Sequence, residues 1–307
     1  MEDKVFSYKE SFDFSIERVI GRCSIPVSTL GIGEAIGDLN DDDFVVITAR
    51  GGVGKTWMLL QLARDLAVFN KKIAFFSGEM SLEEIMLQRL AWMSPETKPL
   101  ADKNVLPSQK KIIIEKIPNL PMWFPNITER WTFRETCIPV MDLLREKHEV
   151  EIFFFDHLRF FMNVDPANAR TQERLITEQT VLDMRLYAKK YKTPIFLAVQ
   201  PSKQDSDTET TIDSMKGTSA ISQDATTVIV LDRKREKSKS DEGEIIFAPF
   251  INLKIEKARH GKGNMNIKVV LDAPNGRFIE WDKGGSEIAY KISEARQIKA
   301  MKETFNP

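Results

Sequence analysis

The sequence predicts an α/β fold, in which a mostly parallel, twisted sheet carries helices on both faces and continues into a C-terminal antiparallel extension. From Asp43 onward, short apolar runs alternate with amphipathic stretches, which is typical of parallel strands covered by helices. A glycine-rich turn links the first apolar run to the first amphipathic stretch. After residue 231 the apolar segments lack helical periodicity, and Pro274, Asn275 and Gly276 form a turn signal typical of a hairpin.

The expected strands are short apolar runs, and two of the expected helices have a clear apolar side. The strand candidates are residues 44–48, 73–77, 152–156, 195–200 and 227–231, with a weaker one at 122–124. The apolar helix positions are Met58, Leu62, Leu66 and Phe69 after the first strand, and Leu175, Leu182 and Leu186 before the strand at 195–200. Because the members of each set share one side of a helix, we expect both sets to pack in the core.

The length and composition are those of one globular domain with short appendages. With 307 residues, of which 42% are hydrophobic, the chain can bury one substantial core. We expect a main domain at residues 36–285, an N-terminal segment at 1–35 and a C-terminal helical tail at 286–307. Within the main domain, a charged run at 233–244 separates the parallel part from the antiparallel part.

Charge, cysteine content and hydropathy exclude several classes of protein. Lys and Arg number 44 and Asp and Glu 45, so a site for a polyanion must be a local patch. Cys23 and Cys137 lie far apart and in no metal-ligand spacing, which predicts two packing residues in a reducing compartment. The sequence lacks a signal peptide and any run of about 18 apolar residues, which predicts a soluble, cytoplasmic protein outside the membrane.

The strongest motif is a phosphate-binding loop between the first strand and the first helix. It comprises Ala49, Arg50, Gly51, Gly52, Val53, Gly54, Lys55, Thr56 and Trp57. The glycines let backbone N–H groups surround phosphates, and the helix start adds its positive dipole end. Lys55 is expected to reach the β and γ phosphate oxygens and Thr56 to ligate Mg²⁺, so ATP and Mg²⁺ are the predicted cofactors. Ala49 replaces the first glycine of the strict pattern. A purely structural glycine turn is the alternative, which the Lys55-Thr56 pair disfavours.

Two carboxylates follow strands and are candidates for the remaining chemistry. Asp156 ends the run EIFFFD, where a carboxylate is expected to hold Mg²⁺ through water, although an aspartate there can also cap a loop. Glu79, in FFSGEMS, follows the strand at 73–77 and is a candidate to orient the attacking water as general base. From spacing alone, Glu79 is equally well a charge at a helix N-terminus.

Several motifs occur in one order, among them AFFSGEMSLEEIMLQRLA, FFFDHLRFF, MKGTSAISQDATTVIVLDR and LKIEKARHGKG. In this order they resemble the motor domains of DnaB-type replicative hexameric helicases and of phage primase-helicases, over about residues 25–282. The resemblance implies a RecA-like P-loop ATPase core that forms a hexamer and moves along single-stranded DNA to unwind duplex. The alternatives are a RecA-like ATPase that acts as recombinase, loader or remodelling factor without unwinding, and an assembly factor that keeps ATP as a structural ligand.

The resemblance also assigns roles to single residues. Glu79 corresponds to the family's catalytic glutamate, and Gln200 to the polar sensor that couples the γ-phosphate to the DNA-facing loop. Lys257 and Arg259 correspond to the pair that reaches the neighbouring subunit's nucleotide, with Arg259 as arginine finger. Without the resemblance, the segment LKIEKARHGKG is better interpreted as a solvated basic strand end.

The polar segment after the strand at 195–200 is the candidate DNA-binding surface implied by the resemblance. Its candidate residues are Lys203, Lys216, Gly217, Thr218 and Ser219. Contacts of this kind bind the DNA backbone and carry little sequence information. The acidic residues of the same segment favour the alternative of a plain surface loop.

The chain departs from the resembled family in two respects. His157 stands where the family usually carries an aromatic residue, and a lone histidine there is expected to be a packing or polar substitution. The sequence contains neither the helical N-terminal domain of the bacterial helicases nor a primase domain, which favours a compact phage or plasmid protein.

Its expected partners are single-stranded DNA, further copies of itself, and a primase or helicase loader. Residues 1–35 resemble a linker that docks on the adjacent subunit; packing on its own core is the alternative.

Substitution of Lys55 by alanine tests the phosphate-binding loop. Lys55→Ala is expected to abolish ATP hydrolysis, because the ammonium is the side-chain cation that the loop brings to the β and γ phosphates. Phosphate release measures the outcome, and retained hydrolysis would contradict the assignment.

Overall fold

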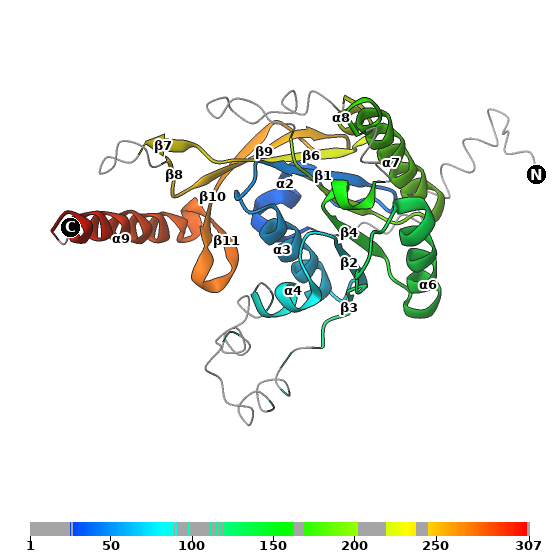
Figure 1. Cartoon of the computed structure of the whole chain (residues 1–307), viewed down its shortest axis with the longest axis horizontal. Coiled ribbons are helices and arrows are strands. Elements are labelled where there is room, and N and C mark those ends of the chain that lie inside the picture. The colour runs from blue at the N-terminus through cyan, green and yellow to red at the C-terminus, as the bar shows by residue number, and fades with distance from the viewer. Residues whose placement is uncertain are drawn as a thin grey trace, which may run out of the picture.

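The computed structural model describes residues 25, 27–88, 90, 98, 111, 115, 117, 119–162, 169–201, 219–237 and 245–305. Within these residues, nine strands form one mixed sheet in the order β11-β10-β9-β6-β1-β5-β4-β2-β3 (Figure 1). The strands are β1 (Phe44–Ala49), β2 (Ile73–Ser77), β3 (Met122–Trp123), β4 (Ile152–Asp156), β5 (Ile195–Val199), β6 (Thr227–Asp232), β9 (Ile251–Ala258), β10 (Met265–Asp272) and β11 (Arg277–Glu280). The strands from β6 to β3 are parallel, and β9, β10 and β11 are antiparallel, which confirms the predicted fold class.

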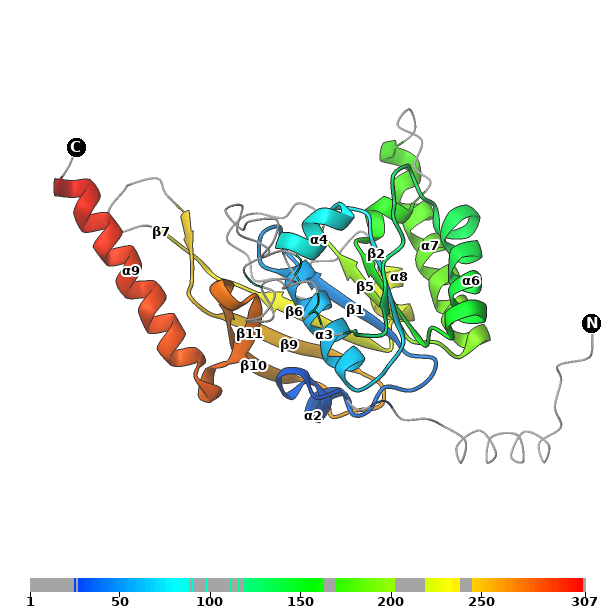
Figure 2. The ribbon, with the colours of Figure 1, turned by 90° about the horizontal axis from the view of Figure 1, so that it is seen from below.

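Helices cover both faces of the sheet, as predicted. The short α2 (Ile32–Ile36) and α3 (Lys55–Val68) lie on one face, whereas α6 (Ile138–His148) and α7 (Ala169–Tyr191) lie on the other (Figure 2). Successive residues of β1 pack alternately into the two cores: Val45 and Ile47 toward α3, and Phe44 and Val46 toward α6 and α7. Because both faces of the parallel strands are buried, their sequences are continuous apolar runs.

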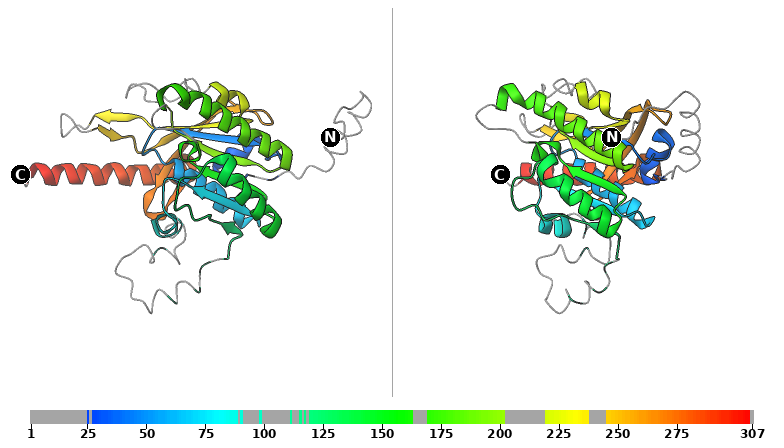
Figure 3. Two further views of the ribbon diagram at one scale, coloured as in Figure 1. Left: turned by 45° about the vertical axis from the view of Figure 1, so that its right-hand side comes forward. Right: turned by 90° about the vertical axis from the view of Figure 1, so that its right-hand side faces the viewer.

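The remaining elements extend this core at its edges. The helices are α4 (Leu82–Gln88), α8 (Ser219–Asp224) and α9 (Gly285–Phe305), and the short turns include Leu158–Phe161 and Ala273–Asn275. The strands β7 (Arg235–Lys237) and β8 (Ile245–Phe247) form an antiparallel pair within and just after the charged run. Helix α9 extends away from the sheet (Figure 3). No helix in the described ranges is long and apolar enough to cross a membrane.

The two cysteines were predicted to be packing residues. Cys137 lies in the core formed with α6 and α7, and burial raises the pKa of its thiol to about 12. This confirms the prediction for Cys137. Cys23 lies outside the described residues.

The predicted core face of α7 is wrong. Leu175, Leu182 and Leu186 are 66%, 39% and 53% exposed. The buried residues of the helix are Thr177, Thr180, Val181, Met184, Tyr187 and Ala188. This buried face contains two threonines, which count as polar in a sequence pattern, so the three leucines indicated the wrong side. In α3 the predicted Met58, Leu62 and Leu66 are buried, whereas Phe69, just past the helix end, is exposed.

Truncation of single side chains distinguishes the two sides of α7. Met184→Ala is expected to lower the free energy of unfolding by about 2–5 kcal/mol, because it leaves a cavity in the core. Leu186→Ala on the exposed side is expected to change it by no more than about 0.5 kcal/mol. Urea unfolding followed by circular dichroism measures both, and equal losses would contradict the observed helix orientation.

Candidate nucleotide-binding site

The glycine-rich loop connects β1 to α3 through a turn that depends on glycine at two positions. Gly52 has a φ of 76° and Gly54 a φ of 114°, in the left-handed region that glycine adopts without strain. A Cβ at Gly52 would meet no atom within 4 Å, so the outer side of the loop is open to a ligand. Ala49 is fully buried at the end of β1, so the methyl group at the position of the first glycine belongs to the core. The loop is therefore open to solvent at Gly52, just before the start of α3, where a phosphate would meet the positive end of the helix dipole.

Lys55 is the buried cation of this loop. Its Nζ donates to the carbonyl oxygen of Ala49 at 3.0 Å. Burial lowers the pKa of Lys55, and the nearby carboxylates of Asp156 and Glu79 oppose this shift. A desolvated ammonium ion of this kind is stabilised by anionic phosphate oxygens, so its position fits a nucleotide.

Thr56 and Asp156 form the part of the site that fits a magnesium ion. Thr56 Oγ1 donates to Asp156 Oδ2 at 2.7 Å, and Asp156 is fully buried at the end of β4. Mg²⁺ prefers oxygen ligands and is usually held by one or two protein oxygens together with phosphates and water. Within the described residues no group of three His, Cys, Asp or Glu side chains forms a metal site. The hydroxyl and the carboxylate therefore fit Mg²⁺ only together with a phosphate ligand.

Glu79 lies in the turn between β2 and α4. Ser77 Oγ donates to the Met80 carbonyl and accepts from the Met80 N–H, which fixes this turn. Ser81 and Glu84 form a capping box at the start of α4: each side chain accepts a hydrogen bond from the other residue's N–H. Because Ser81 and Glu84 cap the helix, the Glu79 carboxylate is not used as a cap and is available to the site. It lies close enough to Lys55 to affect the pKa of that ammonium.

His157 contacts the Glu79 carboxylate, with 3.5 Å between His157 Nε2 and Glu79 Oε2. Burial lowers the pKa of His157, and the carboxylate of Glu79 opposes this shift. The imidazole ring also packs edge-on against Phe160, with 4.9 Å between ring centroids. The sequence predicted a packing or polar substitution at this position, and the contact with Glu79 was missed. The sequence signal that could have indicated this contact is the place of His157 directly after Asp156, at the edge of the predicted site.

Gln200 and Phe278 complete the surroundings of the loop. Gln200 directly follows β5, and a Cβ at Gly51 would lie 3.5 Å from its Nε2. Phe278 of β11 approaches from the other side, where a Cβ at Gly54 would lie 3.0 Å from its ring. The sequence gives no sign that Phe278 belongs to this site, because only the pairing of the antiparallel strands brings β11 next to α3.

The other predicted loop and DNA-binding residues have different outcomes. Val53 is buried, Arg50 and Trp57 are half-buried, and Trp57 packs against the core on the α3 face. Lys203, Lys216, Gly217 and Thr218 lie outside the described residues, and Ser219 is the first residue of α8.

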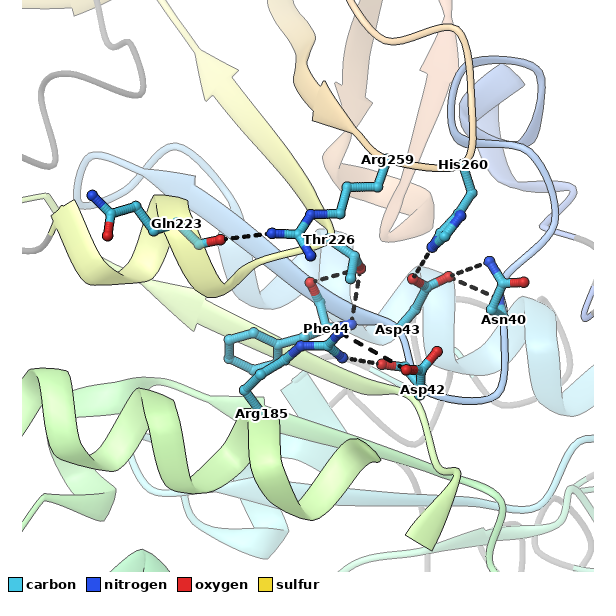
Figure 4. A network of polar contacts seen from close by, with 9 residues as sticks. All are labelled: Asn40, Asp42, Asp43, Phe44, Arg185, Gln223, Thr226, Arg259 and His260. Carbon is cyan, nitrogen blue, oxygen red and sulfur yellow. Dashed lines mark hydrogen bonds and ion pairs between the residues drawn. The ribbon is translucent and has the colours of Figure 1, made fainter. Parts of the chain in front are cut away.

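Lys257 and Arg259 lie at the opposite edge of the sheet, where the parallel strands begin. Strand β9 runs antiparallel to β6, so its C-terminal end lies where β1 begins, roughly 20 Å from the loop at about 3.3 Å per strand residue. Lys257 Nζ donates to the carbonyl oxygen of Ser222 at 2.7 Å. Figure 4 shows the neighbouring contact, in which Arg259 Nη2 donates to the carbonyl oxygen of Gln223 at 3.0 Å. Arg259 as a whole is exposed.

The structure therefore divides the predicted residues into two groups. Lys55, Thr56, Glu79, Asp156 and Gln200 meet at the carboxyl edge of the parallel strands, whereas Lys257 and Arg259 lie at the other edge. One chain thus carries a nucleotide site at one edge and two exposed or half-exposed cations at the other.

The protein is similar in sequence to several replicative helicases. It is 24% identical over 247 residues to the replicative DNA helicase DnaB of Mycoplasma genitalium, covering 77% of this chain and 52% of the relative. It is 23% identical over 225 residues to a probable plasmid replicative DNA helicase of Chlamydia trachomatis, covering 71% and 47%. The chain spans about half the length of the curated relatives that it matches.

Solved structures share the fold. One of them, a solved ATPase domain, matches with a TM-score of 0.68 at 16% identity, covering 90% of this chain and 99% of that one. A DnaB-like replicative helicase, described with its interactions with primase, matches with a TM-score of 0.69 at 16% identity, covering 89% and 68%. The fold is therefore that of the RecA-like ATPase domains of such helicases. The family model of the DnaB-like helicase C terminal domain matches residues 25–280, and the chain belongs to this family.

Proposed function

We propose that the protein is the motor of an ATP-dependent replicative DNA helicase, which assembles as a hexamer, moves along single-stranded DNA and unwinds duplex. Family membership supports the class of activity. A phage or plasmid origin is part of the proposal, and the similarity to a probable plasmid helicase of Chlamydia trachomatis supports it.

The observation that best supports the proposal is the separation of Arg259 from the glycine-rich loop of its own chain. Arg259 lies at the edge of the sheet opposite to Lys55, so it cannot reach a nucleotide bound to the same chain. In a ring with one nucleotide site per interface, Arg259 of one subunit reaches the site of the next. A cation that arrives in trans stabilises charge on the transferring phosphoryl group, so hydrolysis depends on assembly.

The residues at the loop have separate roles in the proposed reaction. Bound Mg²⁺-ATP supplies the phosphoanhydride that is cleaved. The loop N–H groups and Lys55 bind the phosphate oxygens, and Thr56 and Asp156 hold the metal. Glu79 accepts a proton from the attacking water. Gln200, between the loop and the segment that follows β5, couples the state of the nucleotide to that segment.

The DNA contacts are proposed for residues 202–218 and the start of α8. The candidates remain Lys203, Lys216, Gly217, Thr218 and Ser219. Acidic residues outnumber the lysines in this segment, so the attraction for phosphates is assigned to the single side chains of Lys203 and Lys216 and to backbone N–H groups at residues 217–219, and not to the net charge of the segment. The other proposed partners are a primase or a helicase loader, and the solved helicase described with its primase interactions supports the first. Unwinding of a forked duplex tests the whole proposal, since a DNA-stimulated ATPase that leaves the fork intact would be a remodelling factor or recombinase.

Glu79→Gln is expected to preserve nucleotide binding and to reduce hydrolysis by about 10²- to 10⁴-fold. The amide keeps the shape of the side chain but cannot accept a proton from water. Nucleotide affinity is measured by a fluorescent analogue and turnover by phosphate release. A collapse of affinity with unchanged turnover per bound nucleotide would assign Glu79 a structural role.

Arg259→Ala is expected to reduce hydrolysis by about 10³- to 10⁵-fold while each chain still binds nucleotide. Lys55→Ala chains are inactive because their own loop lacks its cation, but they keep Arg259. In a mixture of the two variants, an Arg259→Ala chain supplies Lys55 and a neighbouring Lys55→Ala chain supplies Arg259, so some interfaces contain both residues. We expect the mixture to regain hydrolysis. Arg174→Ala, on the exposed side of α7, is the matched control. Full activity of Arg259→Ala alone would exclude a role in trans.

A further inference from the structure

The side chain of Glu79 needs an orienting contact. Its side chain is 52% exposed, and glutamate has three rotatable side-chain bonds, so in isolation the carboxylate would sample many directions. A general base has to keep one oxygen within hydrogen-bond distance of the water it activates. Within the described part of the chain, the ionisable group that lies within ion-pair distance of the Glu79 carboxylate is His157.

The turns that carry Glu79 and His157 are fixed to each other. The Gly78 N–H donates to the Asp156 carbonyl at 2.8 Å, which joins the turn after β2 to the turn after β4. A Cβ at Gly78 would lie 2.3 Å from Phe160 Cβ, so only glycine permits this approach. Glu79 and His157 therefore keep their relative position as long as β2 and β4 stay paired.

The imidazole ring of His157 is itself held in place. Its side chain is 10% exposed, and it packs against Phe160, whose N–H donates to the His157 carbonyl at 3.0 Å. In this position, Nε2 lies 3.5 Å from Glu79 Oε2. A shift of a few tenths of an ångström turns this contact into a hydrogen bond from the ring N–H.

We propose that His157 is a positioning residue for Glu79: its Nε2–H binds one carboxylate oxygen and leaves the other directed at the attacking water. The proposal rests on the proposed role of Glu79 as general base. Both the neutral Nε2–H tautomer and the imidazolium donate from this atom, so the contact needs no change of protonation. The alternatives are that His157 only fills space, or that it acts through the neighbouring Asp156 on the metal.

Three substitutions of His157 separate these possibilities by shape. His157→Phe keeps the ring and its packing on Phe160 but removes the donor. His157→Gln places an amide nitrogen near the position of Nε2, and His157→Asn places it near Nδ1, away from Glu79. Loss of a hydrogen bond to a charged group corresponds to about a 10- to 100-fold change. We expect kcat for ATP to fall by this factor in the Phe and Asn variants and to recover in His157→Gln.

The Michaelis constant and the magnesium dependence identify the group through which His157 acts. If His157 acts by positioning Glu79, then kcat falls in the Phe and Asn variants, whereas KM for ATP and the Mg²⁺ concentration for half-maximal activity stay unchanged. A raised Mg²⁺ requirement would overturn the proposal in favour of an effect on Asp156. Unchanged kcat in His157→Phe would overturn it in favour of packing alone. Thermal unfolding of each variant checks the fold, and if the Phe variant is unfolded, the contrast between Gln and Asn decides the outcome.

A double-mutant cycle with Glu79→Gln provides the decisive measurement. If His157 acts through the Glu79 carboxylate, then His157→Phe has no further effect on kcat once that carboxylate is gone. Independent, multiplying losses would overturn the proposal. Failure of the proposed role of Glu79 is distinguishable, because in that case Glu79→Gln itself leaves hydrolysis intact, and failure of the helicase function appears only as an intact forked duplex. A slow Glu79→Gln variant together with a fully active His157→Phe variant would overturn the inference about His157 alone.

Discussion

The parallel pairing of β2, β4, β5 and β1 is the constraint on which the site depends. Parallel neighbours end at the same edge of a sheet, so the residues that follow each strand converge there although they are far apart in sequence. The loop after β1, Asp156 at the end of β4 and the residues after β2 and β5 meet in this way. Each strand is buried on both faces, and the two apolar cores hold this edge in register.

The buried charges at this edge depend on one another. Lys55 loses hydration by burial, and the carboxylates of Asp156 and Glu79 offset part of that loss. Thr56 satisfies one oxygen of Asp156. Removal of Lys55, Thr56 or Asp156 leaves a charge or a polar atom at a desolvated position, so substitutions of these three residues are expected to affect binding and turnover together.

The antiparallel strand β9 gives the chain its second functional edge. Lys257 and Arg259 donate to carbonyls of Ser222 and Gln223, near the C-terminal end of α8, where a helix carries its negative dipole end. The segment after β5 leads into this same helix. Helix α8 therefore connects the proposed DNA-facing segment with the two cations proposed to act on the next subunit. Strand β6 follows α8 and pairs with β1, which leads into the nucleotide loop.

Local patterns in the sequence determined the strands, the glycine-rich loop and the antiparallel C-terminal hairpin, because a buried strand or a phosphate loop leaves its signature in adjacent residues. They also indicated Thr56 and Asp156, the two residues proposed to hold the metal. The tertiary structure alone decided which side of α7 is buried, since Thr177 and Thr180 lie on the buried side and the leucines face outward. It also decided that His157 faces Glu79 and that Phe278 lies beside Gly54. Those contacts, and the placement of Arg259 at the far edge, follow from strand pairings between distant segments, and no local pattern encodes such pairings.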